Sequence, residues 1–149
     1  MVSVWLPESS GEGQRPFSLR LYSPPGERVR LLFQPLRPSG CPDWDPQWED
    51  WHSYLFPLAV GYRDYEALLK EYFLVMYPTK DPVDGSPETA FDPCSPNWLG
   101  RESWEKLAVI LHRDLERVPR KRRNFYDAFL RWLEAALQHT DIIVTEGNQ

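Results

Sequence analysis

The chain has 149 residues, of which 42% are hydrophobic and 14% aromatic, and its formal net charge is −5. This length and apolar content suit a soluble protein with its own core and exclude a disordered chain. No run approaches the ~20 apolar residues that cross a membrane, and the first residues lack the features of a secretory signal. We therefore expect one domain over residues 1–149, located in the cytoplasm.

Charge is spread unevenly along the chain. Residues 41–100 carry eleven acids against three bases, whereas residues 101–149 carry nine bases against eight acids. An acidic middle argues against nucleic acid as a partner and favours a basic protein. The two cysteines, Cys41 and Cys94, suit a reducing compartment as thiols, with a disulfide between them left open. Too few other ligands accompany them for a zinc site.

The first forty residues predict β-strands. Residues 17–22 alternate apolar and polar side chains, and residues 27–33 follow as a second strand. Between them, Pro24-Pro25-Gly26 is typical of a type II turn, in which glycine supplies the positive φ. The pattern therefore predicts an antiparallel hairpin.

A helix is predicted to begin at Asp45, which would act as N-cap with Pro46 in the first helical position. Trp48 and Trp51 then fall on one face of this helix. Pro57 and Gly61 are expected to interrupt it.

A further helix is predicted from about Asp64 to Met76, because apolar side chains recur there at helical spacing. Residues 78–97 follow with five prolines and form the longest irregular segment. Loops of this length and composition are often functional or mobile, and the sequence leaves the order of this one undecided.

The two clearest helical patterns come last. In the first pattern, Trp104, Leu107 and Leu111 recur at helical spacing, and Pro119 separates it from the second, which covers about residues 122–139. Asp141-Ile142-Ile143-Val144-Thr145 is β-branched and predicts a final strand that joins the N-terminal sheet. The fold class is therefore α+β, with N-terminal antiparallel strands and a C-terminal strand packed against about three to four helices.

Catalytic signatures are missing from the sequence. There is no Gly-x-Ser-x-Gly turn, no glycine-rich phosphate loop and no cofactor motif. No second His or Cys lies three or four residues from His52, His112 or His139. The sequence thus favours a non-catalytic binding protein over an enzyme and predicts neither a cofactor nor a metal.

One acidic and aromatic stretch, residues 43–54, is the strongest candidate for function. A glycosidase pair is disfavoured because carboxylates adjacent in sequence rarely span a sugar, and the calcium-loop pattern is absent. Carboxylates interleaved with indole rings instead suit the binding of Arg and Lys side chains. The predicted partner-binding residues are Asp43, Trp44, Asp45, Trp48, Glu49, Asp50 and Trp51.

Two interpretations of this stretch remain open. In the first, it binds a basic protein, and bacterial immunity proteins that neutralise cationic toxins offer a compositional analogy. In the second, Trp48 and Trp51 anchor the core while the acids are merely solvated, and Trp44 is the residue least easily explained in that way.

The alternative function is a small hydrolase or ligand-binding domain with a pocket between the sheet and the C-terminal helices. Its polar candidates are His112, Glu146 and Asn148. The basic run at residues 117–123 is interpreted as a solvated turn whose cations lie near a helix C-terminus. Oligomeric state is not determined by the sequence.

Overall fold

The computed structural model describes residues 17–36 and 57–148. Its main element is a mixed five-stranded sheet of order β1-β3-β2-β7-β6, and a two-stranded ribbon, β4-β5, lies beside it. The strands are β1 (Phe17–Leu19), β2 (Arg30–Pro35), β3 (Leu58–Gly61), β4 (Thr79–Lys80), β5 (Pro87–Glu88), β6 (Asn97–Gly100) and β7 (Ile142–Gly147). The predicted final strand is confirmed, since β7 pairs antiparallel with β2.

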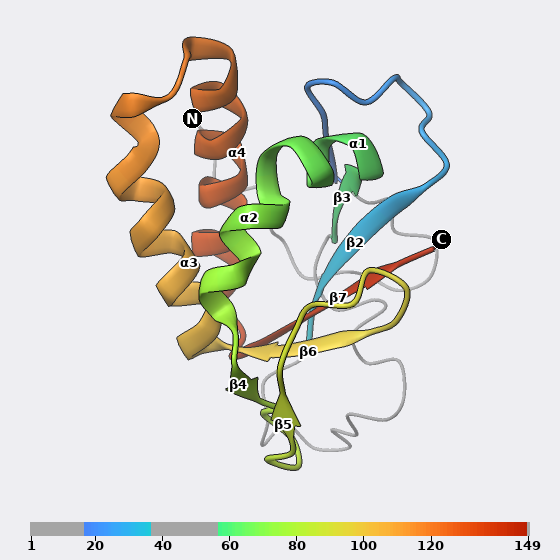
Figure 1. Ribbon diagram of the computed structural model, residues 1–149, viewed down its shortest axis with the longest axis vertical. Coiled ribbons are helices and arrows are strands. Elements are labelled where there is room, and N and C mark those ends of the chain that lie inside the picture. The colour runs from blue at the N-terminus through green and yellow to red at the C-terminus, as the bar shows by residue number, and fades with distance from the viewer. Residues whose placement is uncertain (1–16, 37–56, 149) are drawn as a thin grey trace.

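The helices lie together on one face of the sheet (Figure 1). Two of them are long: α3 (Arg101–Asp114) and α4 (Arg120–Leu137). Residues 62–76 wind through short turns: α1 (Tyr62–Asp64), a π-helical turn, α2 (Lys70–Phe73) and a 3-10 turn. The α+β class is confirmed. The expectation of three to four helices is wrong for the described residues, where only two long helices form, and the helix predicted from Asp45 lies outside them.

The predicted N-terminal hairpin is wrong, although its turn forms as expected. Glu27 N donates to Pro24 O at 3.2 Å, and Gly26 has φ +75°. However, β3 lies between β1 and β2, parallel to the first and antiparallel to the second. Pro57, expected to interrupt a helix, instead precedes this strand, and Gly61, expected to do the same, is its last residue. The reason is tertiary: Leu58, Ala59 and Val60 are buried between the neighbouring strands β1 and β2, more fully than they would be at a helix end.

The predicted apolar faces of the C-terminal helices are confirmed. On α3, Trp104, Leu107 and Leu111 are buried, and the whole predicted stripe of α4 is buried as well. The buried residues of that stripe are Phe125, Phe129, Trp132, Leu133, Ala136 and Leu137. Over the described residues, no helix is both long and apolar enough to cross a membrane.

The proline-rich segment at residues 78–97 is more regular than its sequence indicates. It contains the β4-β5 ribbon, and its last turn is held by Asn97, whose Nδ2 donates to Thr145 O at 3.0 Å and to Ser95 O at 2.8 Å. A Cβ at Gly147 would lie 1.9 Å from Pro93 O, so the segment rests directly against β7. Glycine is required there because the two backbones touch.

Candidate binding surfaces

The acidic and aromatic stretch lies in the connection between two neighbouring antiparallel strands. β2 ends at Pro35 and β3 begins at Leu58, whereas a direct hairpin needs about two to five residues. Both ends of this connection are fixed by the sheet. Leu36 N donates to Ile142 O at 2.9 Å, and Phe17 N donates to Pro57 O at 2.7 Å. All seven predicted partner-binding residues, 43–51, fall inside it and lie outside the described residues.

The polar candidates for a ligand pocket do not converge. His112 Nε2 lies 2.8 Å from Glu134 Oε2 on the exposed surface of α3 and α4. Glu146 accepts a hydrogen bond from Gln34 Nε2 at 3.2 Å, and Asn148 bonds to backbone groups at the start of β2. Each candidate has its own neighbour, and none of the main cavities in the described part of the chain is lined by two of them.

The space between the sheet and the helices is filled by aromatic side chains. Phe33, on β2, is fully buried and lies at the centre of this cluster. Its ring contacts four others edge to face at centroid distances of 5.5–6.2 Å: Phe73, Trp104, Phe129 and Trp132. The region where the alternative function requires a pocket is therefore packed as core.

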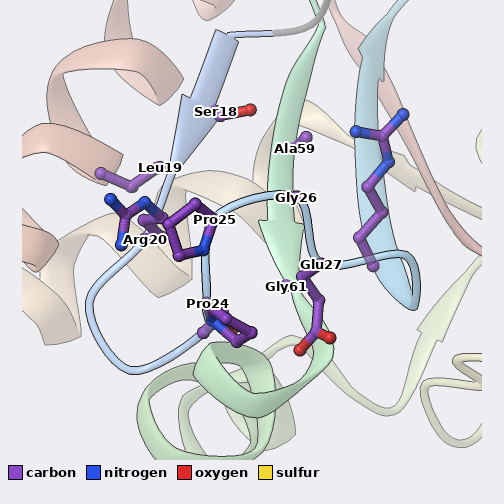
Figure 2. Close-up of a pocket in the computed structure, with 11 residues that line it drawn as sticks. Ser18, Leu19, Arg20, Pro24, Pro25, Gly26, Glu27, Ala59 and Gly61 are labelled. Carbon is purple, nitrogen blue, oxygen red and sulfur yellow. The ribbon is translucent and has the colours of Figure 1, made fainter.

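A small hollow of about 200 Å³ lies beside the Pro24-Pro25-Gly26 turn. Figure 2 shows β3 beneath it, with Ala59 and Gly61 on that strand. Three charged side chains line the hollow, Arg20, Glu27 and Arg30. Arg20 and Glu27 point to different sides of it (Figure 2). Because these charges do not meet at a common point, the hollow has no clear ligand centre.

The segment before this turn is held by Asp64. The Asp64 carboxylate is completely buried and accepts backbone hydrogen bonds from Leu21 at 2.8 Å, Tyr22 at 2.6 Å and Ser23 at 3.3 Å. Ser23 Oγ accepts a hydrogen bond from Asp64 N in return, at 3.2 Å. A buried carboxylate is stable in this position because amide groups solvate it. The sequence offers no local signal for this contact, since the partners lie 41 to 43 residues away.

A cleft of about 590 Å³ lies where residues 66–75 meet α3 and α4. At its edge, Tyr72 Oη donates to Asp114 Oδ2 at 2.8 Å, and Arg113 Nε donates to Asp114 Oδ1 at 2.9 Å. The hydrogen bond from Arg113 holds the pKa of Asp114 below its usual value. The pKa of Tyr72 is raised to about 12, mainly by burial and to a smaller extent by the hydrogen bond to Asp114. At neutral pH this pair is therefore an ionised acid and a neutral phenol, neither of which is poised for proton transfer.

Buried tyrosines predict a loss of stability in alkali. Burial is the main cause that raises the pKa of Tyr65, Tyr72 and Tyr126 to about 12, from 10 in an unfolded chain. Their contribution to stability is complete below pH 10 and is lost as the pH rises towards 12. We expect the urea midpoint to fall across this pH range. The absorbance of phenolate should rise at a higher pH in the folded protein than in the unfolded chain. In Tyr72→Phe the urea midpoint should fall less over the same pH range. A wild-type midpoint that stayed constant up to pH 12 would show that burial does not raise the pKa of these tyrosines.

The basic run surrounds the turn between α3 and α4. Its exposed cations are Arg117, Arg120, Lys121, Arg122 and Arg123. The interpretation as cations near a helix C-terminus holds for Arg117, which ends the 3-10 turn after α3, and for Arg123, which donates to the carbonyls of Leu115 and Val118. It is wrong for Arg120 and Lys121, because both lie in the first turn of α4.

Comparison with known proteins assigns no family to this chain. No family model, curated protein or solved structure matches this chain. Across residues 17–36 and 57–148, no group of three or more His, Cys, Asp or Glu is placed to hold a metal ion. Any functional assignment therefore depends on the chain's own residues.

Proposed function

We propose that this protein is a non-catalytic binding module that engages a basic protein through residues 43–54. The observation that carries the proposal is the composition of this stretch, in which four carboxylates alternate with three tryptophans. Carboxylates pair with Arg and Lys side chains, and indole rings accept the same cations on their faces. Trp is also enriched among the residues that dominate protein interfaces.

The placement of the stretch supports this proposal. The connection that contains it leaves the sheet at Leu36 and rejoins it at Pro57, and these two residues bond to the neighbouring strands β7 and β1. Long connections carried by a rigid scaffold are common sites of binding. An immunity or inhibitor-type protein, acting in the cytoplasm on a cationic partner, is the form of this function that the charge distribution favours.

The first experiment identifies the partner and tests its charge. Tagged protein is captured from its own cells, washed at low and then at high salt, and analysed by native mass spectrometry. We expect a stoichiometric basic protein that is retained at low salt and lost at high salt, because salt screens the attraction between opposite charges. A bare protein, or one that retains a small molecule instead, would contradict the proposal.

The second experiment measures association with that partner. Reversal of Asp43, Asp45, Glu49 and Asp50 to Lys is expected to lower the association rate constant about tenfold or more at low salt. The matched control reverses four exposed acids on the helices, Glu66, Glu71, Glu102 and Glu116, with the same change in net charge. An equal loss of rate in both variants would assign the effect to net charge alone and remove residues 43–54 as the binding surface.

A further inference from the structure

The face of the sheet that points away from the helices carries a second apolar cluster. Successive side chains of a strand point to opposite faces of its sheet. On β7, Ile143 belongs to the main core beneath the helices, so its neighbour Val144 lies on the other face. The residues of this second cluster are Leu36, Ile142 and Val144, with Trp98 packed against them.

The helices do not account for the burial of the second cluster. Leu36 and Val144 are 0% exposed, and the polar Gln34, which lies beside them on β2, is only 3% exposed. The helices of the described residues lie on the opposite face of the sheet (Figure 1). Because a sheet face is buried only when another layer packs on it, a further part of the chain covers this cluster.

The connection at residues 37–56 begins at the second cluster. Leu36, the residue before it, belongs to the cluster and donates its backbone N–H to Ile142 O at 2.9 Å. The connection ends at Pro57, before β3, and β3 is the direct neighbour of β2. Neighbouring strands are about 5 Å apart, whereas a chain of this length extends to about 65 Å. The connection is therefore long enough to fold back over the face on which it begins.

The sequence of the connection provides one apolar side. Trp48, Trp51 and Leu55 recur at spacings of three and four residues and share one side of a helix, whereas Glu49 and Asp50 fall on the other. A helix of this kind is stabilised when its apolar side is buried against another element. Each indole supplies about 150–250 Å² of surface for such a contact.

We propose that residues 37–56 dock on the helix-free face of the sheet, with Trp48 and Trp51 packed against the second cluster. The carboxylates on the opposite side of the segment then face solvent. Where it concerns binding, this assignment rests on the function proposed above, since it leaves Trp44 and the carboxylates to meet a basic protein. The docking itself takes place within one chain and does not require the partner.

The position of the cluster favours this connection over residues 1–16, the other long segment outside the described residues. Residues 1–16 lead into β1, and two strands, β3 and β2, separate β1 from β7. The connection at residues 37–56 instead starts within the cluster, at Leu36.

The test measures how fast the thiol reagent DTNB reaches a buried cysteine in the full-length protein. Both native cysteines are first removed by C41S/C94S. In that background V144C places one thiol in the second cluster, and I143C, the matched control, places one on the helix-covered face of the same strand. Val144 and Ile143 are both fully buried, so both thiols should react slowly.

We expect W48S/W51S to raise the labelling rate of V144C about tenfold or more and to leave that of I143C within about twofold, because only one face of the strand is uncovered. An unchanged rate at V144C would overturn the proposal. If the double variant unfolds and both thiols react, W48S and W51S are compared singly. Equal acceleration of both thiols in the single variants would also overturn it.

Two further variants separate the alternatives. A faster reaction of V144C in W5S/L6S, with no effect of W48S/W51S, would overturn the proposal in favour of residues 1–16. E49K/D50K should leave the labelling of V144C within about twofold of its original rate, because these carboxylates face solvent, and a larger acceleration would contradict this orientation. Capture of a basic partner is measured separately, so failure of the proposed function would leave the labelling result intact.

Discussion

Replacing Asp64 with alanine is expected to lower the free energy of unfolding by about 2–4 kcal/mol, as measured by urea denaturation. The carboxylate accepts three backbone hydrogen bonds, from Leu21, Tyr22 and Ser23, and is completely buried. Its removal leaves those amides without their acceptor, and the loss of such a partner costs more than a typical hydrogen bond contributes. Hydrogen exchange of the three amides should also accelerate, because they are then held only weakly to the start of the helical segment at residues 62–76.

Asp81 provides the matched control for this prediction. Its carboxylate also accepts a backbone hydrogen bond, from Val83 at 2.7 Å, but in the exposed turn between β4 and β5. Water can replace that acceptor, so Asp81→Ala should cost less than about 1 kcal/mol. If both variants lost the same stability, Asp64 would not be the contact that fixes residues 21–23.

The Phe33→Ala variant is expected to lose about 3–5 kcal/mol of stability, because a large cavity remains where the ring was. Phe33 is fully buried and contacts four aromatic rings, two of which belong to α4. Its ring occupies the space between sheet and helices, where the alternative function requires a ligand pocket. The loss is measured as a shift of the urea midpoint at an unchanged slope.

Two further measurements check that a cavity causes this effect. Phe33→Leu should lose less stability than Phe33→Ala, since leucine retains most of the buried volume. Benzene should raise the Tm of Phe33→Ala and leave that of the wild type unchanged, because engineered apolar cavities of this size bind such ligands. If benzene stabilised the wild type as well, the region would already contain a cavity and the packed-core assignment would be wrong.

Two segments of opposite charge come from different parts of the chain, the acidic residues 43–54 and the basic residues 117–123. Residues 43–54 are acidic and were identified from composition alone. The positive charge of residues 117–123 is equally visible in the sequence. Whether these cations favour or oppose helix formation depends on where α4 begins. Cations at residues 120 and 121 would be unremarkable at a helix C-terminus, and they require another explanation once they occupy the first turn of a helix.

The tertiary structure decided the strand pairing and the polar contacts between distant residues. Turn chemistry at Pro24-Pro25-Gly26 predicted the turn correctly, but it could not show that β3 is inserted between the two flanking strands. Asp64 likewise appears in the sequence as an ordinary residue near the start of a helix. Its role depends on amides 41 to 43 positions earlier in the chain, and no local pattern records such a contact.

By itself, the sequence determined the α+β class, the apolar faces of α3 and α4, and a final strand that joins the N-terminal sheet. Each of these follows from a periodic pattern within one segment, in which burial of one face is the dominant free-energy term. Strand order, the burial of Asp64 and the position of the basic turn relative to α4 were decided only by the tertiary structure. They depend on which segments compete for the same neighbours in space, and that competition acts between residues far apart in the chain.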